Sequence, residues 1–257
     1  MSIYMKGALE KVKSGVLGTN GVLGRVSRGI LDVVFPARCV GCGEEGHYIC
    51  RRCEGFTSEA ALICPLCQQS SLTGERHENC TSLYGLEGLA SIWEYEGVVK
   101  SLLHSIKYKG MTHAVVETVQ NACISMAGDK MRFGAFLSYL FSRDTYITYV
   151  PMFRRKEKFR GFNQAAVFAR EMGKAVGKSA VSLLEKIVDT KPQVDLTKEE
   201  RLHSIKDVFA ALPSGMPEKI VLVDDVWTTG ATMKECCKVL KKSGVEKVWG
   251  FTLARTP

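Results

Sequence analysis

One stretch near the C-terminus, residues 219–232, limits the fold of this chain more than any other. It contains an uninterrupted apolar run from Ile220 to Val223, in which three of the four residues are β-branched. A strand buried on both faces of a parallel sheet has this composition, because neither face meets water. Two carboxylates, Asp224 and Asp225, follow the run, and a loop of small residues then leads into a helical pattern. The stretch therefore predicts a strand, a loop and a helix of an α/β sheet.

The loop after this strand has the composition of a site for a sugar phosphate. Open α/β sheets bind ligands at the carboxyl ends of their strands, where Asp224 and Asp225 are expected to lie. Backbone N–H groups at a helix N-terminus favour an anion, and carboxylates accept hydrogen bonds from vicinal hydroxyl groups. We expect the two acids to bind ribose hydroxyls and the loop to bind a 5′-phosphate. The loop residues are Thr228, Thr229, Gly230, Ala231 and Thr232.

This segment resembles the phosphoribosyl-pyrophosphate (PRPP) signature of type I phosphoribosyltransferases. In that signature four hydrophobic residues and two acids precede Thr-Thr-Gly-Ala-Thr or a close variant. The alternative is a buried strand followed by a capped helix, in which Asp-Asp is only a turn. That alternative requires the apolar run, the acids and the loop to fall into register by chance.

A basic segment follows another predicted strand, at 146–150. Its cations are Arg154, Arg155, Lys156, Lys158 and Arg160. Because the carboxyl ends of parallel strands lie along one edge of a sheet, we expect this segment to face Asp224 and to hold pyrophosphate by charge-assisted hydrogen bonds. The alternative is a solvated basic loop. The formal net charge of +8 is compatible with either a polyphosphate ligand or a nucleic-acid partner and does not distinguish between them.

The chain contains ten cysteines. Residues 1–24 have neither the compact apolar core nor the cleavage site of a secretory signal, and no run reaches the roughly 18 apolar residues of a membrane span. We therefore expect a cytoplasmic protein, whose thiols stay reduced and are available to bind metal. Cys123, Cys236 and Cys237 fall in predicted helices, and we interpret them as packing residues.

The other seven cysteines and one histidine form four pairs with two residues between the members of each pair. Each pair can direct two ligands at one tetrahedral zinc ion, and two pairs complete its shell. The simplest assignment has an all-cysteine shell of Cys39, Cys42, Cys50 and Cys53, and a mixed shell of Cys64, Cys67, His77 and Cys80. Interleaved pairing is also compatible with the spacing, and His77 can instead be an ordinary surface or core residue. We therefore expect one or two structural zinc ions.

From Leu89 onward, strands alternate with helices, which predicts a parallel sheet. The expected strands are 89–95, 146–150, 181–188, 220–226 and 248–253. The expected helices are 98–108, 115–126, 163–176 and 231–242. The predicted organisation is a weakly structured segment with a short helix at 1–36, a double zinc ribbon at 37–85, and the sheet domain at 86–257.

Taken together, these features resemble the ComF/GntX family, in which a double zinc ribbon precedes a type I phosphoribosyltransferase domain. The resemblance extends from about Leu31 onward. Besides the cysteine pairs, its motifs are Phe-Pro-Ala-Arg-Cys at 35–39, Lys-Tyr-Lys-Gly at 107–110, Arg-Gly-Phe-Asn-Gln at 160–164, Asp189-Thr190 with Gln193 and Leu196, Glu200-Arg201, Phe209, and 222–232. The chain departs from the family pattern with Met152-Phe153 in place of a second Val-Pro and with Ser204 in place of Asn.

The resemblance implies a type I phosphoribosyltransferase fold and a role in natural competence or in the use of DNA. It implies that Asp224 and Asp225, the candidate catalytic residues, bind the ribose of PRPP with Mg²⁺ nearby. It also implies that Arg154, Arg155 and Arg160 lie beside the pyrophosphate. Other competence proteins would be partners.

No residue stands out in the sequence as a general base for an incoming nucleobase. An enzyme that transfers phosphoribose is therefore one hypothesis. A catalytically silent adaptor that senses nucleotides or binds single-stranded DNA is the second, and a PRPP-responsive regulator is the third. The aromatic residues Tyr48, Phe56 and Tyr84 are expected to form the small core of the zinc ribbon, and in the adaptor they would stack bases.

Overall fold

The computed structural model describes residues 37–109, 111–189, 207–213 and 215–257. Four parallel strands form one sheet in the order β1-β6-β5-β2. The strands are β1 (Gly88–Glu94), β2 (Thr145–Tyr149), β5 (Lys219–Trp227) and β6 (Lys247–Arg255). The predicted α/β class and the four strands of this sheet are confirmed. The helix predicted at 30–35 lies outside the described residues.

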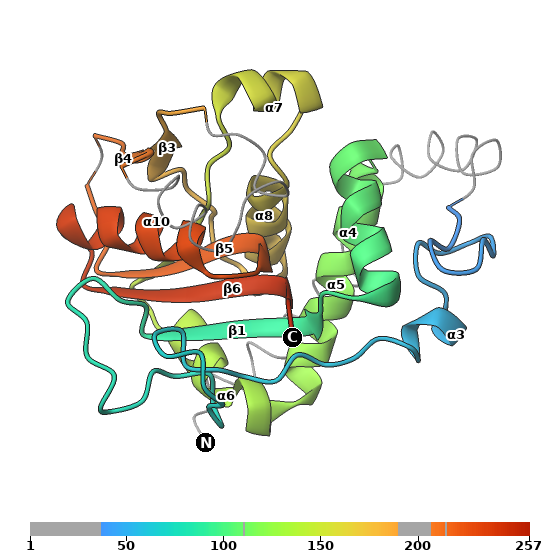
Figure 1. Cartoon of the computed structure of the whole chain (residues 1–257), viewed down its shortest axis with the longest axis horizontal. Helices are drawn as coiled ribbons and strands as arrows, with labels where there is room; N and C mark the ends of the chain where they lie inside the picture. The colour runs from blue at the N-terminus through green and yellow to red at the C-terminus, as the bar shows by residue number, and fades with distance from the viewer. Residues whose placement is uncertain (1–36, 110, 190–206, 214) are drawn as a thin grey trace.

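Helices cover both faces of this sheet (Figure 1). They are α4 (Gly97–Lys109), α5 (Thr112–Gly128), α6 (Lys130–Leu140), α7 (Arg154–Arg160), α8 (Gln164–Val176) and α10 (Ala231–Lys242). α10 packs on one face, whereas α5, α6 and α8 pack on the other. The sequence patterns predicted four of these helices, but α6 and α7 were not predicted.

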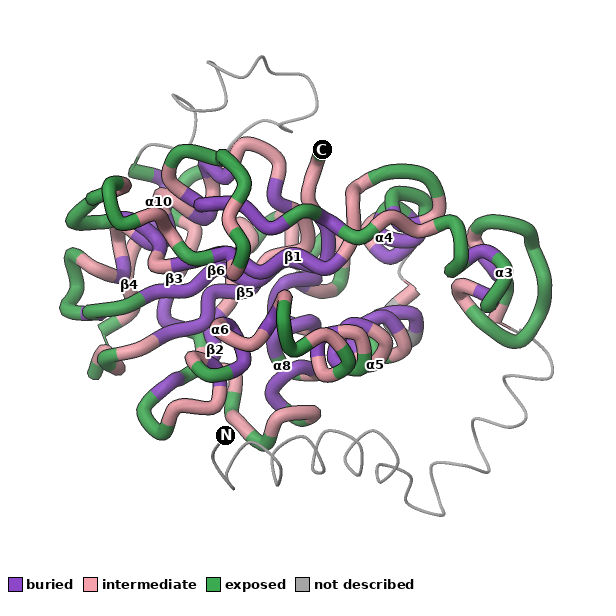
Figure 2. Tube along the Cα trace, turned by 90° about the horizontal axis from the view of Figure 1, so that it is seen from below, coloured by how far each residue is buried: buried purple, intermediate pink, exposed green. Residues whose placement is uncertain are grey.

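The apolar run of β5 is explained by its place between these two layers. Ile220 and Leu222 are buried against α10, while Val221 and Val223 are buried against the helices of the opposite face. All four side chains are fully enclosed. Figure 2 shows that the buried part of the chain is concentrated in the sheet and the inner sides of the helices. A strand with two covered faces has no position for a polar side chain until it reaches the edge of the sheet.

The strand predicted at 181–188 is wrong in its extent and in its sheet. Only β3 (Leu184–Lys186) forms a strand there, and it pairs antiparallel with β4 (Phe209–Ala211) in a separate two-stranded sheet. The chain touches the main sheet before β3, through a single parallel bridge between Ile147 and Ala180. A three-residue strand is too short for its burial pattern to show which sheet it joins.

The cysteine-rich segment, residues 37–87, lies along the free edge of β1. Residues 58–60 run beside that strand, with Ala60 N–H donating to the Ile92 carbonyl at 3.0 Å and Glu94 N–H to the Ser58 carbonyl at 2.8 Å. Arg132 of α6 also donates to the carbonyls of Ala60, Ser91 and Ile92. The segment therefore covers backbone groups that an edge strand would otherwise leave exposed.

Two of the three aromatic residues expected in the core of the ribbon are at its surface. Phe56 is 75% exposed and Tyr84 is 38% exposed, whereas Tyr48 packs against the main hydrophobic core. This segment has little apolar core of its own.

Within the described ranges, no helix is both long enough and apolar enough to cross a bilayer.

Candidate functional site

Asp224 and Asp225 lie near the carboxyl end of β5, which ends at Trp227. Asp224 pairs with Thr252 of β6. Its carboxylate accepts a hydrogen bond from the Asp225 N–H at 2.9 Å, and the Asp225 carboxylate accepts one from the Val226 N–H at 2.8 Å. Burial, and then the adjacent Asp225 carboxylate, raise the pKa of Asp224 well above its usual value. Two acids held this close together favour a bound cation or hydroxyl donors between them.

The loop after these acids is shaped by Gly230. This residue has φ +73° and forms the N-cap of α10. A Cβ atom at Gly230 would lie 2.1 Å from the ring of Trp227, so glycine is required by the backbone angle and by the space. Trp227 is 1% exposed and acts as the floor of the loop. The N–H groups of the first turn of α10 therefore lie at the end of β5, beside the two acids.

A cavity of about 500 Å³ opens over this loop and the acids. Side chains of α4 and of the segment after β1 complete its wall. The lining residues are Tyr95, Lys100, Leu103, Lys107, Asp224, Asp225, Val226, Trp227, Thr228, Gly230, Ala231, Thr232, Met233 and Thr256. Thr229 is not among them. The structure thus brings together most of the loop residues and the two acids that were predicted from the sequence.

A second cavity, of about 160 Å³, lies on the other side of the acids and shares Asp224, Asp225 and Lys107 with the first. Four cations line it: Lys107, Lys156, Arg160 and Lys186. Burial, and then the nearby Lys156 ammonium group, lower the pKa of Lys186, whereas Asp189 and Asp224 act in the opposite direction. A small space with four cations and two carboxylates suits a polyanion bound together with a divalent metal ion.

The three arginines predicted beside a pyrophosphate do not lie together. Arg160 lines the second cavity and donates to the Gln164 side chain. Arg154 and Arg155 lie in α7 on its outer side, where their side chains are 85% and 81% exposed. Arg154 pairs with Glu185 at 3.5 Å, and Arg155 pairs with Asp189, which also pairs with Lys156 at 2.8 Å. Both arginines thus join α7 to the segment that contains β3, on a shallow surface that does not include Asp224.

The Arg-Gly-Phe-Asn-Gln motif at 160–164 forms the turn between α7 and α8. Asn163 caps α8 by accepting from the Ala165 N–H at 3.1 Å, and it donates to the Val150 carbonyl at 3.0 Å. This ties the helix to the end of β2. Gln164 is 3% exposed and lines the second cavity, and its Nε2 has no acceptor among the residues that the structure describes. The motif therefore fixes the wall of this cavity as well as the helix start.

The structure separates the cysteine pairs into the two sequential groups rather than interleaved ones. Cluster I contains Cys39, Cys42, Cys50 and Cys53, and cluster II contains Cys64, Cys67, His77 and Cys80. In each cluster all four ligand atoms lie within 4.8 Å of one another. A tetrahedral zinc ion with Zn–S distances of about 2.3 Å would set its sulfur ligands roughly 3.8 Å apart. The donor sets and their spacing therefore fit zinc.

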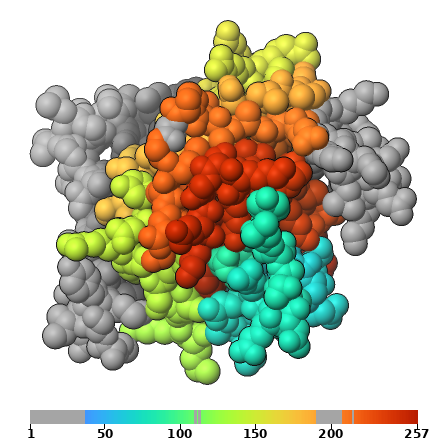
Figure 3. Space-filling model, turned by 90° about the vertical axis from the view of Figure 1, so that its left-hand side faces the viewer, coloured from blue at the N-terminus to red at the C-terminus, as the bar shows by residue number. Residues whose placement is uncertain are grey.

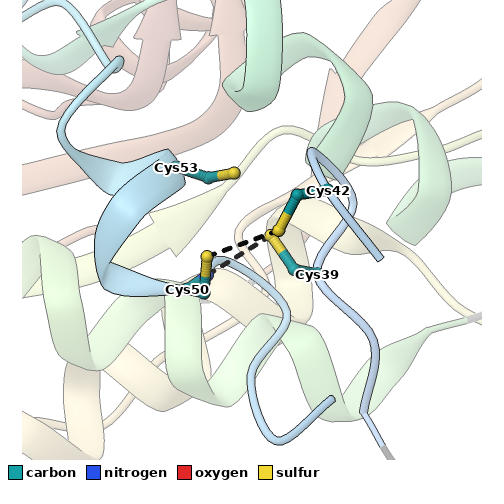
Figure 4. Close-up of side chains that lie close together, drawn as sticks. All are labelled: Cys39, Cys42, Cys50 and Cys53. Atoms are coloured by element: carbon teal, nitrogen blue, oxygen red, sulfur yellow. Dashed lines mark hydrogen bonds between the residues drawn. The ribbon is translucent and has the colours of Figure 1, made fainter. Parts of the chain in front are cut away.

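Figure 4 shows the four side chains of cluster I directed toward a common centre. The Sγ atoms of Cys42 and Cys50 are 3.6 Å apart, and the Cys50 N–H donates to the Cys39 sulfur at 3.4 Å. Burial acts in the opposite direction, but backbone N–H groups lower the pKa of Cys39 to about 6. The backbone thus favours at Cys39 the thiolate form that metal binding needs, whereas burial raises the pKa of Cys53 to about 12.

Cluster II includes the histidine whose role was open. His77 Nε2 is 3.0 Å from the Ser70 carbonyl, while Nδ1 is 3.4 Å from the Cys67 sulfur and 4.0 Å from that of Cys80. A backbone carbonyl that accepts from one ring nitrogen leaves the other nitrogen free to ligate a metal ion. The geometry therefore fits His77 as the fourth ligand through Nδ1.

Four residues around the acids did not enter the list of site residues predicted from the sequence: Tyr95, Lys100, Lys107 and Lys186. Lys107 belongs to the Lys-Tyr-Lys-Gly motif, and this was its only signal. Lys186 lies in a strand that was assigned to the wrong sheet. Their elements are far apart in the sequence, so only the fold shows that these side chains surround Asp224 and Asp225.

Comparison with known proteins finds relatives that share most of the chain. Competence protein ComFC of Streptococcus pneumoniae is 27% identical over 212 residues, which is 80% of this chain and 87% of that protein. DNA utilization protein YhgH of Escherichia coli K12 is 23% identical over 217 residues, or 82% of this chain and 92% of that protein. Competence protein F of Haemophilus influenzae is 31% identical over 110 residues, which is 41% of this chain and 48% of that protein. No family model matches the chain.

Proposed function

We propose that this chain, which belongs to the family of the ComF and ComFC competence proteins and the YhgH DNA-utilisation proteins, binds PRPP with Mg²⁺ and supports the uptake or use of DNA. One observation supports PRPP as the ligand. The acids at the end of β5 lie between a loop suited to phosphate and a cavity lined by four cations. PRPP has its ribose between a monophosphate and a pyrophosphate, so its charges match this order.

In this proposal each part of PRPP has its own group of residues. The N-terminal turn of α10 and the loop at 228–232 bind the 5′-phosphate, since backbone N–H groups there have no helical acceptor. Asp224 and Asp225 accept hydrogen bonds from the ribose hydroxyls. The pyrophosphate lies in the second cavity among Lys107, Lys156, Arg160 and Lys186. Arg154 and Arg155, which bind Glu185 and Asp189 instead, keep α7 in place.

The carboxylates of Asp224 and Asp225 have the oxygen atoms that Mg²⁺ prefers as ligands, and they would hold the ion beside bound PRPP. Bound there, Mg²⁺ would neutralise charge on the pyrophosphate as it leaves. The lysines and Arg160 would add positive charge at the same place. With these groups the site can support displacement of pyrophosphate from ribose C1 by a nucleophile, which makes the chain a candidate phosphoribosyltransferase.

A second candidate function is that of an adaptor that binds single-stranded DNA. Its support is the pair of exposed aromatic rings in the cysteine-rich segment, Phe56 and Tyr84. Lys242 of α10 lies 5.7 Å from the centre of the Tyr84 ring. An exposed ring beside a cation offers a base a stacking surface and a contact for its phosphate.

Titration calorimetry with PRPP and Mg²⁺ tests the ligand. Asp224→Asn with Asp225→Asn should lower PRPP affinity by roughly 100-fold or more, because two hydrogen bonds to charged groups are lost. Asp144→Asn, which changes an exposed carboxylate elsewhere, is the control and should bind as the unchanged protein does. Circular dichroism would establish that the double variant is folded. Equal PRPP affinity in a folded double variant would refute the site.

A further inference from the structure

One end of the first cavity is left over when PRPP is placed as proposed. The lining residues that the proposed PRPP complex leaves without a role include Tyr95, Lys100, Leu103 and Thr256. α4 stands at the carboxyl-terminal edge of the sheet (Figure 1). Its residues Lys100, Leu103 and Lys107 are spaced by three and four positions, so they share one face of the helix. This face lies across the cavity from Asp225.

The remaining space combines an aromatic ring with an apolar side chain. Tyr95 follows β1, and its N–H donates to the Arg255 carbonyl at 2.7 Å, which fixes the backbone at this point. Leu103 is 4% exposed and belongs to the main hydrophobic core, so its position is also fixed. An aromatic ring and a branched aliphatic group in the wall of one cavity favour a flat, partly apolar ligand.

The charged and polar groups at this end can mostly donate hydrogen bonds. Lys100 and Lys107 have only donors, and Asp224 and Asp225 are engaged with the ribose in the proposed complex. Among the described residues, no carboxylate lies within 4.0 Å of the Lys100 ammonium group. Lys100 is exposed at the rim, where a ligand would meet it. A ligand that accepts hydrogen bonds and carries negative charge fits this end better than a neutral base does.

The chemistry of the reaction favours the same kind of ligand. Displacement at C1 requires a ring nitrogen with a free electron pair, and a neutral base that carries N–H must first lose a proton. No histidine lines either cavity within the described part of the chain. A pyridine-type nitrogen has no proton to lose, so it needs no general base.

We propose that the acceptor is a nitrogen heterocycle that carries a carboxylate, with its ring between Tyr95 and Leu103 and its carboxylate on Lys100; this rests on the proposed function. The ring nitrogen gives its electron pair to C1 and forms the new N–C bond. The C1–O bond breaks, and pyrophosphate leaves with the electron pair of that bond. Lys107, Lys156, Arg160 and Lys186 stabilise the charge on the departing group.

The test measures binding to the full chain with Mg²⁺, in two titrations. The first uses PRPP alone. The second uses the PRPP-saturated protein and two matched pairs of probes with a pyridine-type nitrogen, nicotinate with nicotinamide and isonicotinate with isonicotinamide, which differ mainly in the carboxylate. We expect the carboxylates to bind about 10-fold more tightly than their neutral partners, as expected for one charge-assisted contact.

Variants assign this preference to Lys100. Lys100→Gln should remove most of the roughly 10-fold preference, since the charged contact is lost, and Lys100→Arg should retain it. Both variants should keep the PRPP affinity of the unchanged protein. Lys130→Gln, at an exposed position of α6, is the control and should change neither titration.

The two titrations distinguish an error in the proposed function from an error in the acceptor class. Failure of the unchanged protein to bind PRPP overturns the proposed function and the acceptor class together. Normal PRPP binding, with neutral bases bound as tightly as carboxylates, overturns the acceptor class alone. A carboxylate preference that survives in Lys100→Gln overturns the assignment to this residue.

Discussion

Clusters I and II have similar ligands and begin with the same backbone turn, but they are attached to the protein differently. In cluster I the Gly43 N–H donates to the Cys39 carbonyl, and in cluster II the Gln68 N–H donates to the Cys64 carbonyl, each at 2.8 Å. Both residues have positive φ, +79° for Gly43 and +63° for Gln68. The same turn is therefore built once with the residue that accommodates it and once with a residue that is strained there.

Cluster I has few apolar neighbours. Its buried core consists of Cys39, Cys50 and Cys53, against which Ile49 and Val98 of α4 pack. Figure 2 shows the chain around α3 (Arg51–Glu54) as largely exposed, at one end of the molecule. A module with so little apolar core depends on its metal ion for most of its stability.

Cluster II is joined to the sheet by many contacts. Ile63 and Leu86 belong to the hydrophobic core beneath α10. Glu87 pairs with Lys241 of α10 at 2.7 Å and with Arg76 at 3.0 Å. Figure 3 shows the residues near 80 lying against the C-terminal part of the chain. On the other side, Gln68 Nε2 is 3.5 Å from the Thr229 carbonyl of the phosphate loop.

This difference suggests that the two metal sites have different consequences. Cluster I contacts the rest of the protein through few residues, namely Val98 of α4 and the partly buried Val40, Tyr48 and Ile49, so we expect disorder there to remain local. Cluster II shares its core with α10, which also supplies the proposed phosphate site. We therefore expect the loss of metal from cluster II to disturb the structure of the ligand site, and the loss of metal from cluster I to leave that site intact.

The largest expected effect comes from removing one ligand from each cluster. Cys39→Ser and Cys64→Ser should each lose about one zinc ion from a protein that holds two, because structural zinc binding and local folding are coupled. Only Cys64→Ser should also lower the melting temperature of the sheet and the affinity for PRPP. Metal analysis, thermal unfolding and calorimetry measure the three quantities. Equal losses of PRPP affinity in the two variants would remove the distinction between the clusters.

A smaller effect is expected from glycines near each cluster. Gly43 and Gly74 have nearly the same φ, +79° and +76°, but a Cβ at Gly43 meets nothing within 4 Å, whereas one at Gly74 would lie 2.4 Å from the Leu89 carbonyl oxygen. Gly43→Ala should cost about 1 kcal/mol of unfolding free energy, from the backbone angle alone. Gly74→Ala should cost about 3 kcal/mol, because it also displaces the backbone of β1.

Denaturant unfolding followed by the far-ultraviolet circular dichroism of the sheet measures both glycine variants. The Gly43 variant is the control for the backbone angle. If the two substitutions lower the unfolding free energy equally, the region of cluster II is not packed against β1 as closely as the structure shows.

The sequence predicted the main sheet well because burial on two faces leaves a long signal. The apolar run of β5 and the alternation of strands with helices need no knowledge of distant contacts. β3 has only three residues and pairs with β4, more than twenty residues later in the chain. Neither strand is long enough for its apolar pattern to predict this pairing. α6 was missed although Phe133, Phe136, Leu137 and Leu140 have helical spacing and are buried. This short amphipathic pattern is a signal for α6 within the sequence itself.

For the candidate site, the sequence predicted the residues that are contiguous in the chain and missed those that the fold brings in from distant elements. Asp224, Asp225 and the loop after them are contiguous, so their chemistry can be seen directly. Lys186 and Lys107 come from other elements, and each is an ordinary lysine in its own segment. The partners of Arg154 and Arg155, Glu185 and Asp189, lie about thirty residues further along the chain. A run of cations therefore predicted an anion site without showing which of them the protein itself neutralises.

The smallest expected effect concerns Gln68, the residue that occupies in cluster II the position of Gly43 in cluster I. Gln68→Gly should not destabilise the protein, because glycine relieves the strained backbone angle, and this gain offsets its larger entropy in the unfolded chain. PRPP affinity should nevertheless fall about twofold, since one long, exposed hydrogen bond to the phosphate loop is lost. Gln69→Gly, at the adjacent exposed residue, is the control for PRPP affinity and should leave it unchanged. Affinity would then fall without a loss of stability at a single position, which a merely structural role of the turn does not explain. A Gln68→Gly variant with full PRPP affinity would show that cluster II supports the sheet without acting on the ligand site.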